Sequence, residues 1–415
     1  MKIVINKERF IYLMIFLNPF FEIIYGLLYR MNIDLPINQL CRMVMFVSFW
    51  IMIANDKKSF SNVFLIVVCD TLIWMLQVAV GISRVSFDEI VFLIKLIYAT
   101  SLPAIFLSLI RTKLIDKNKF INAIIYSTFV IVFSLCISPF GLGFRAWETN
   151  SYRTGYVGWF RFGNYLTATL LVSFCLILID KTVRRRKVWI FFTIIALVLT
   201  GNKAALIGLV GYTVWISLYW LIHEKNEHAN KFFMAIVVVF FPIVCLIGIF
   251  FVVDYVKNQI ALYDAYGYKN LFTFLLSNRN LQVRSVVNSL RGEVFETWGK
   301  VIGYGFSNVI NCIKYNNRGN SLEMDLYGLY YYVGLVPLVM WIFIYFRAIV
   351  NAFFNYKRNR SLGNWMLIIG LAIIVFHSVF SGHVIFESLT VVYAAALIAI
   401  SNSNVSRRMK TIEEP

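Results

Sequence analysis

Charged residues are scarce in this chain, at 14% of its 415 residues, whereas hydrophobic residues make up 60%. With a mean hydropathy of +0.73, this composition excludes an ordinary soluble domain, which could not bury so much apolar surface. Acidic residues are fewer than basic ones: 21 oppose 39 lysines and arginines, for a formal net charge of +18. In a membrane protein we attribute that excess to residues that orient spans and to an external cluster, and we expect no nucleic-acid partner.

Cysteine and histidine are also few. Five of the six cysteines lie in or at the edges of apolar runs and Cys312 is alone in a polar loop, so no disulfide and no metal site is predicted. Two of the four histidines, His377 and His383, flank the short turn HSVFSGH, a weak metal pattern with no supporting cluster. We retain His383 as a candidate residue of an outer vestibule.

Motifs for nucleotide or metal chemistry are missing. The chain contains no Walker loop, no dinucleotide-binding fingerprint and no HExxH. It also has no cytoplasmic domain that could hold a nucleotide, and we predict no cofactor. Any chemistry must therefore use an activated substrate delivered through the membrane.

Long apolar runs dominate what is present. Twelve could cross the roughly 30 Å hydrocarbon core. They lie at 10–29, 37–54, 62–81, 89–110, 120–137, 164–179, 188–201, 204–222, 232–253, 322–346, 365–381 and 384–402. The basic loops on one side, such as NDKKSF and DKTVRRRK, predict that this side is cytoplasmic and holds both termini. The predicted fold is an all-α polytopic membrane protein with a single integral domain over 1–415.

Two predicted external loops, 139–163 and 254–321, together hold eleven lysines and arginines. Long loops cross regardless of charge, so the topology stands, but the charge needs a reason. In the first loop Arg145, Arg153 and Arg161 are spaced by eight, with aromatic residues between them. Guanidinium groups suit phosphate and aromatic faces stack on sugars. The alternative is an interfacial belt with snorkelling arginines.

The second loop contains NRNLQVRSVVNSLRGEVFETWGK, which has helical periodicity. Its predicted apolar stripe consists of Val287, Leu290, Val294 and Trp298. Arg284, Asn288 and Arg291 share another face. We predict an amphipathic helix on the outer membrane surface, and the alternative is that these charges are only a solvated face.

Charges also occur where apolar segments turn or cross. Lys203 lies in the tight external turn LTGNKAAL, either as a functional cation or as an interfacial anchor. Glu22, Arg42 and Lys95 lie within predicted spans, each very roughly 8–10 Å below the outer surface. Their equal depth predicts ion pairing, and structural pairing is the first interpretation, because intramembrane charges are usually paired or functional.

Four stretches carry a family pattern: YRTGYVGWFRFGNYLTATL, LTGNKAALIGL, LRGEVFETWGKVIGYG and EMDLYGLYYYVGLVPL. Each is loose alone, but they occur in order over roughly the last two-thirds of the chain, alongside the predicted spans and the large late loop. On this basis the chain resembles the O-antigen polymerase and ligase superfamily, Wzy-type polymerases in particular.

The resemblance implies a metal-independent membrane glycosyltransferase of the GT-C class, working at the outer face of a bacterial plasma membrane. Such enzymes move a sugar chain from an undecaprenyl pyrophosphate carrier to an acceptor. Arg153, Lys203 and Arg291 match the family's pyrophosphate contacts. Lys203 replaces the more usual arginine, so it keeps the charge but loses the paired hydrogen bonds of a guanidinium fork. The expected partners are the undecaprenyl-pyrophosphate-linked oligosaccharide, the lipid bilayer, a chain-length regulator and a flippase.

Glu323 and Asp325 begin the predicted span 322–346, beside the cationic loop. Transfer from a lipid pyrophosphate needs cations for the leaving group and a base for the acceptor hydroxyl. We predict a base and its orienter in this pair, with Arg291 as catalytic cation; alternatively, the carboxylates only hold arginines in place. Two residues apart on a helix, they point about 200° from each other, so one is expected to face substrate. The candidate substrate-binding residues are Arg153, Arg161, Lys203, Arg284 and His383.

The predicted function is polymerisation of lipid-linked repeat units into a surface polysaccharide, either O-antigen or capsule. Ligases of the superfamily usually carry a His-Asn pair just before the span that starts here at Leu322, and the second loop contains no histidine. The alternatives are a ligase that transfers polysaccharide to a lipid or protein acceptor, a twelve-span flippase or transporter, and a membrane acyltransferase. A transporter should show polar groups at mid-membrane and often internal repeats, and an acyltransferase should show a base, commonly histidine.

Overall fold

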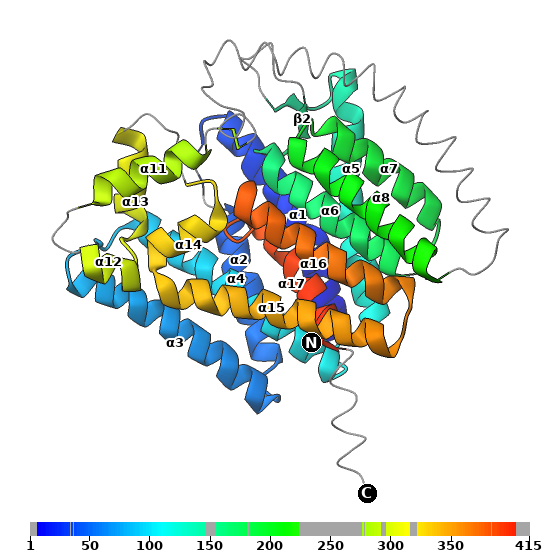
Figure 1. The fold of residues 1–415 in the computed structure, drawn as a ribbon, viewed down its shortest axis with the longest axis horizontal. Coiled ribbons are helices and arrows are strands. Elements are labelled where there is room, and N and C mark those ends of the chain that lie inside the picture. The colour runs from blue at the N-terminus through cyan, green and yellow to red at the C-terminus, as the bar shows by residue number, and fades with distance from the viewer. Residues whose placement is uncertain are drawn as a thin grey trace, which may run out of the picture.

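The computed structural model describes residues 6–33, 35, 37–146, 155–180, 182–223, 276–277, 279–291, 296–315, 322–382 and 384–403. These residues form a helical bundle with one small antiparallel hairpin (Figure 1). The first helices are α1 (Lys7–Arg30), α2 (Ile37–Met52), α3 (Lys57–Ala79), α4 (Phe87–Arg111), α5 (Lys117–Ile137), α6 (Gly163–Ile179), α7 (Arg186–Leu199) and α8 (Lys203–His223). The later ones are α11 (Arg279–Leu290), α12 (Glu296–Ile302), α13 (Phe306–Tyr315), α14 (Asp325–Val333), α15 (Leu335–Arg358), α16 (Leu362–Phe380) and α17 (Ser388–Ser403). A 3₁₀ turn, η1 (Ser138–Phe140), and the paired strands β1 (Phe144–Arg145) and β2 (Tyr156–Gly158) follow α5.

Among the described residues, seven helices are long and apolar enough to cross a membrane: α1, α3, α4, α5, α8, α15 and α16. Three shorter helices, α2, α6 and α17, are also apolar. The mostly helical, multi-pass membrane protein predicted from composition is therefore confirmed. The predicted span 232–253 lies outside the described residues.

The predicted span 322–346 is wrong as a single helix, because the chain breaks at Gly334 into α14 and α15. Gly334 has a φ of +84°, and a side-chain carbon there would collide with the carbonyl oxygen of Val301. Gly303, which follows α12, also has a φ of +84°, and its backbone lies against that of Gly334. Two glycines thus allow the backbones of α12 and α14 to touch, a close approach that no other residue type permits at positive φ. The long apolar helix runs instead from Leu335 to Arg358.

Helices α6 and α17 form the centre of the bundle. Every residue from Tyr165 to Leu178 in α6 and from Ser388 to Ser401 in α17 is buried. Helix α17 packs on α4, α6 and α15, so these two helices meet protein on all sides. The outer helices α3 and α8 expose large apolar side chains such as Leu65 and Val210, a surface that suits lipid.

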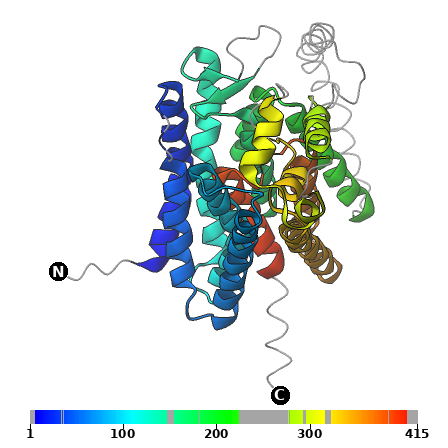
Figure 2. The same ribbon diagram turned by 90° about the vertical axis from the view of Figure 1, so that its left-hand side faces the viewer.

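The basic loops gather at one end of the bundle, where α1 begins and α17 ends (Figure 2). Lys119, in the first turn of α5, pairs with Glu8 of α1, with 3.7 Å between Nζ and Oε1. The Tyr219 hydroxyl donates to the carbonyl oxygen of Arg360 at 2.9 Å, which joins α8 to the loop between α15 and α16. The sequence predicted one basic side, and the fold brings these segments together.

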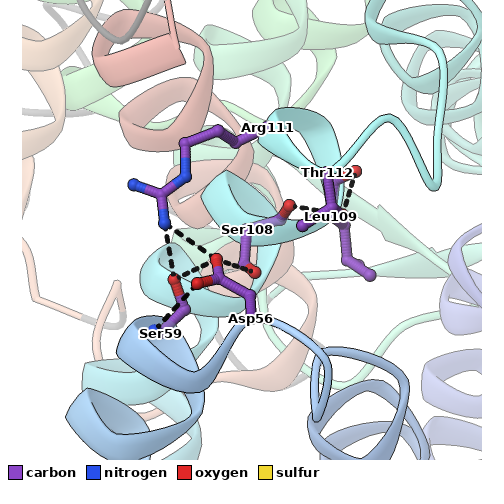
Figure 3. A network of polar contacts seen from close by, with 6 residues as sticks. All are labelled: Asp56, Ser59, Ser108, Leu109, Arg111 and Thr112. Carbon is purple, nitrogen blue, oxygen red and sulfur yellow. Dashed lines mark hydrogen bonds and ion pairs between the residues drawn. The ribbon is translucent and has the colours of Figure 1, made fainter. Parts of the chain in front are cut away.

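Asp56 organises part of this end, as Figure 3 shows. It caps α3 and accepts hydrogen bonds from the Ser59 hydroxyl at 2.7 Å, the Ser108 hydroxyl at 2.7 Å and the Arg111 Nη2 at 2.8 Å. Burial alone would raise the pKa of the Asp56 carboxyl, but these hydrogen bonds lower it to about 2. The ionised carboxylate therefore joins the first turn of α3 to the last turn of α4.

At the opposite end, buried polar side chains of the bundle hold the late helices α12 to α14. The Gln77 amide of α3 donates to the carbonyl oxygens of Ile302 at 2.5 Å and Tyr332 at 2.7 Å. The buried Glu89 carboxylate of α4 accepts from the backbone N–H groups of Phe306 and Ser307, the first residues of α13. A carboxylate at this position satisfies unpaired donors and complements the helix dipole. The second loop is thus attached to the bundle through specific contacts.

The predicted amphipathic helix is partly correct. Arg284, Asn288 and Arg291 are exposed, as expected, but Arg291 follows the last residue of α11 and is a turn residue. Of the predicted apolar stripe, Leu290 is buried, Val287 and Trp298 are exposed, and Val294 lies outside the described residues, so the contact of this stripe with the membrane stays a prediction. The buried face of α11 consists of Arg279, Gln282, Val286 and Leu290. Arg279, at the start of this face, pairs with Glu323, as described below.

Candidate functional site

A buried cluster of charges lies where α1, α2, α4 and the start of α17 converge, toward the end of the bundle opposite the basic loops. Glu22 and Arg42 are each only 2% exposed. The Ser388 hydroxyl donates to Glu22 Oε1 at 2.6 Å, and Arg42 Nη2 lies 3.9 Å from Glu387 Oε2. Lys95 interacts electrostatically with both carboxylates. The predicted association of Glu22, Arg42 and Lys95 is confirmed.

Glu387 was missed by the sequence reasoning. It lies within the predicted span 384–402, but α17 begins only at Ser388, so Glu387 belongs to the preceding turn. A carboxylate four residues into an apolar run was the available signal, since intramembrane charges usually have a partner. Only the packing of α17 against α4 and α2 shows that Arg42 and Lys95 are among its partners.

Arg161, from the loop predicted at 139–163, also faces this cluster. Its Nη1 donates to the Tyr25 hydroxyl, and its guanidinium carbon lies 3.7 Å from the centroid of the Tyr29 ring and 4.6 Å from that of Phe162. Arg161 and Lys95 interact electrostatically. An aromatic cage holds a cation without neutralising it, so Arg161 keeps its charge for another partner.

Backbone contacts hold the first loop in place. A side-chain carbon at Gly26 of α1 would lie 2.7 Å from the carbonyl oxygen of Trp159. Gly155 has a φ of +138° and approaches the backbone of Thr200 so closely that a side chain would collide with its carbonyl oxygen. This contact brings the hairpin to the turn that precedes Lys203, the first residue of α8, which is half-buried. Arg153 lies outside the described residues.

The carboxylates Glu323, just before α14, and Asp325, its first residue, have different environments. Asp325 is 2% exposed, and its Oδ2 accepts from the Val384 N–H at 2.8 Å, the Ile385 N–H at 3.2 Å and the Ser378 hydroxyl at 3.1 Å. Glu323 is about one-third exposed and pairs with Arg279 at 2.8 Å between Oε2 and Nε. The two side chains have separate partners, but Glu323 precedes the helix, so the predicted helical angle between them does not apply. Asp325 holds the last turn, and Glu323 is the more accessible carboxylate.

The last turn connects Glu323 and Asp325 to the buried charges. Gly382 has a φ of +66° and lies against the backbone of Glu323, where a side chain would collide with the carbonyl oxygen. Phe386 packs against Phe92 with 5.0 Å between ring centroids. Glu387 follows directly. The short segment from Val384, which binds Asp325, to Glu387 therefore connects Asp325 to the buried charges around Arg42 (the Arg42 cluster: Glu22, Arg42, Lys95 and Glu387). His383, at the centre of this turn, lies outside the described residues.

Two predicted site residues are not in this interior. Arg284 and Arg291 are exposed on and just after α11. In Figure 1, helices α11 to α13 lie at one side of the bundle, and β2, α7 and α8 lie at the other, with α14, α16 and α17 between them. Arg279, which the sequence reasoning did not select, is the α11 cation that contacts a candidate carboxylate.

The arrangement can stabilise an anion and accept a proton. Three cations, Arg42, Lys95 and Arg161, lie near the carboxylates Glu22 and Glu387. Preorganised cations in a poorly hydrated site stabilise developing negative charge, and an accessible carboxylate such as Glu323 can act as a base. Among the described residues, no group of three or more His, Cys, Asp or Glu side chains is suited to hold a metal ion.

The fold and this site define a polytopic helical membrane protein with a cationic site near one end of its bundle. The sequence pattern of the O-antigen ligase like membrane protein family matches residues 6–265, which is more than half of the chain. The chain therefore belongs to this family of membrane enzymes, which act on lipid-linked polysaccharides. The match includes the segment 139–163 and Lys203 but ends before Arg284, Arg291, Glu323 and Asp325. No curated protein matches the chain.

Proposed function

We propose that the protein is a polysaccharide polymerase that joins undecaprenyl-pyrophosphate-linked repeat units at the outer face of a bacterial plasma membrane. The observation that carries the proposal is the caged Arg161 guanidinium beside the buried Arg42 cluster, in a loop inside the family match. A diphosphate leaving group needs such cations, and its lipid anchor would keep it at this depth. The buried charges Glu22, Arg42 and Lys95 lie toward one end of the bundle, which is less expected of a flippase or transporter.

In the proposed reaction, an acceptor sugar hydroxyl attacks the anomeric carbon that is bonded to the carrier diphosphate. The carbon–oxygen bond to the diphosphate breaks as the new glycosidic bond forms, and the hydroxyl proton moves to a carboxylate. Glu323 is the better placed base because it is partly exposed and oriented by Arg279. Asp325 positions the turn that leads to Glu387. The leaving diphosphate remains on its lipid, stabilised by Arg161, Lys203 and the loop arginines Arg153 and Arg291.

A ligase is the second candidate, because the matching family is described as ligase-like. Purified protein supplied with lipid-linked repeat units distinguishes the two. A polymerase produces a ladder of products, whereas a ligase produces one transfer product and only when its acceptor is present. No product in either condition, from correctly inserted protein, would contradict both activities.

A further inference from the structure

One buried carboxyl group lies near the middle of the membrane, apart from the site described above. Asp70 of α3 is 1% exposed, and it is thirteen residues after Lys57 and nine residues before Ala79, the two ends of the helix. At a rise of about 1.5 Å per residue, these ends are roughly 20 Å and 14 Å away. Asp70 is therefore far from both surfaces of a hydrocarbon core about 30 Å thick. Ionisable residues at such a depth are rare and by default indicate a functional site.

No cation neutralises Asp70 within the part of the chain that the structure describes. Its one electrostatic or hydrogen-bonding partner there is the neutral Thr100 of α4, and its Oδ1 has no hydrogen-bond partner. Lys95 and Tyr98, the titratable residues of α4 nearest in sequence to Thr100, interact with the Arg42 cluster instead. Lys300 of α12, which α3 also contacts, is exposed. A carboxylate without a cation is so costly in apolar surroundings that such a group binds a proton instead.

The contacts of the Thr100 hydroxyl indicate which group carries that proton. Thr100 Oγ1 lies 2.9 Å from the carbonyl oxygen of Leu96, one turn earlier in α4, and 3.1 Å from Asp70 Oδ2. A threonine hydroxyl has one hydrogen to donate, and inside a helix this hydrogen goes to the carbonyl oxygen one turn earlier. The contact with Asp70 then needs a second hydrogen, which a protonated carboxyl supplies. On this count the hydrogen is on Asp70 Oδ2, which donates to Thr100 Oγ1.

The buried face of α3 links Asp70 to the late helices. Asp70 and Gln77 are both buried and lie about two helical turns apart on this face, whereas Leu72 is exposed on another. The Gln77 amide donates to the carbonyl oxygens of Ile302 and Tyr332, where the backbones of α12 and α14 meet. An ionised Asp70 would need water, so α3 would have to separate from α4 to admit it. Gln77 would carry that movement to the contact between α12 and α14.

We propose that Asp70 is a proton-binding site in the middle of the membrane, which holds α3 against α4 while it is protonated and releases this contact when the proton leaves to water. Loss of the proton also loosens the contact between α12 and α14 through Gln77. The site does not depend on the reaction proposed above. A proton is favoured over a metal ion as the ligand, because Thr100 is the one side chain that contacts Asp70 among the described residues and a metal ion needs more oxygen ligands.

The first test is infrared spectroscopy of the full chain in phosphatidylcholine nanodiscs, taken as the difference between wild type and Asp70→Asn. The variant keeps the shape of the side chain, and its amide N–H donates to Thr100 in place of the acid, so it should fold. The difference spectrum should contain the carbonyl band of a protonated carboxyl at neutral pH, and this band should disappear as the pH is raised to about 9. Ionised carboxylate bands alone, throughout the range from about pH 6 to pH 9, would overturn the proposal.

Dicyclohexylcarbodiimide, an apolar reagent, provides a matched comparison on the same helix. It adds to a protonated carboxyl and rearranges to a stable N-acylurea, so the modified residue gains the mass of the whole reagent. At neutral pH, mass spectrometry of peptides should show this adduct on Asp70 and not on Asp56, whose low pKa keeps it ionised. An adduct on Asp56 but not on Asp70 would contradict the assignment.

Hydrogen exchange tests the link through Gln77. The Tyr304 N–H, which donates to the Tyr331 carbonyl oxygen at 2.7 Å, reports on the contact between the segment after α12 and α14. At about pH 9 it should exchange about tenfold faster in the wild type than in Asp70→Asn at the same pH, because only the wild type acquires a buried charge. Gln77→Leu should abolish this difference, since the link is removed. Equal exchange in wild type and Asp70→Asn, at a pH where the infrared band has disappeared, would overturn the coupling to the late helices.

Discussion

The Arg279 guanidinium and the Glu323 carboxylate form an ion pair, with 2.8 Å between Nε and Oε2. The pair joins the first residue of α11 to the segment that leads into α14. The Glu323 backbone N–H also donates to the Gln282 side chain of α11, at 3.3 Å. The α11 helix is therefore oriented by a carboxylate that is itself a candidate base.

Glu323→Gln should reduce polymer formation by about a hundredfold to ten-thousandfold, because the amide cannot accept the acceptor proton. Arg279→Gln should cost much less, since it removes only the orienting partner. The measurement is polymer formed per amount of inserted protein. Equal losses in the two variants, with no further loss in the double variant, would mean that Glu323 acts only through its ion pair.

Asp325→Ala should destabilise the protein by about 1–3 kcal/mol, because the N–H groups of Val384 and Ile385 would lose their buried acceptor. Asp325→Asn keeps one oxygen for these donors and should preserve most of the stability and measurable polymerisation. Thermal unfolding and polymer assays on the same samples check this. If Asp325→Asn is as stable as the wild type but inactive, Asp325 is the base and its positioning role is insufficient.

Arg291→Ala should reduce the transfer rate by roughly a hundredfold or more, as expected for the loss of a donor to the leaving group, about 2.7–4 kcal/mol. Arg291→Lys should recover only part, because it restores the charge without the fork. Lys314→Ala is the control, an exposed cation at the end of α13. Wild-type rates in Arg291→Ala would leave this exposed arginine as an interfacial anchor.

Asp56→Asn should lower the free energy of unfolding by about 1–3 kcal/mol, because it removes a charge-assisted network at the start of α3. The folded-state pKa of about 2 is below the ordinary value of 3.8, so the contribution is present above about pH 4 and is lost as the pH falls toward 2. The difference in apparent melting temperature between wild type and variant should therefore be constant between about pH 5 and pH 8 and shrink in acid.

The control for Asp56 is Asp116→Asn at the start of α5. Asp116 caps its helix through the Lys119 N–H at 2.9 Å. Asp116→Asn should therefore lower the free energy of unfolding less than Asp56→Asn, which also removes an ion pair with an arginine. A greater loss in Asp116→Asn would show that the cap alone determines stability at this end.

Apolar run length predicted most helices within a few residues. Hydrophobicity over a span is a local property, so runs such as 89–110 and 120–137 correspond closely to α4 and α5. The break at Gly334 is different, because the run 322–346 has no polar interruption at that point. The break depends on the approach of Gly303, which follows α12 and lies about thirty residues earlier in the chain.

The charged residues also divide into what the local sequence predicts and what tertiary packing decides. Equal depth in separate spans was sufficient to predict that Glu22, Arg42 and Lys95 associate, because burying a lone charge in hydrocarbon is costly. Which carboxylate faces which cation was decided by packing, which placed Glu387 beside Arg42 and gave Asp325 to the backbone of the last turn. Helix formation follows from short-range periodicity in the chain, whereas the partners of a buried charge are set by the crossing of segments hundreds of residues apart.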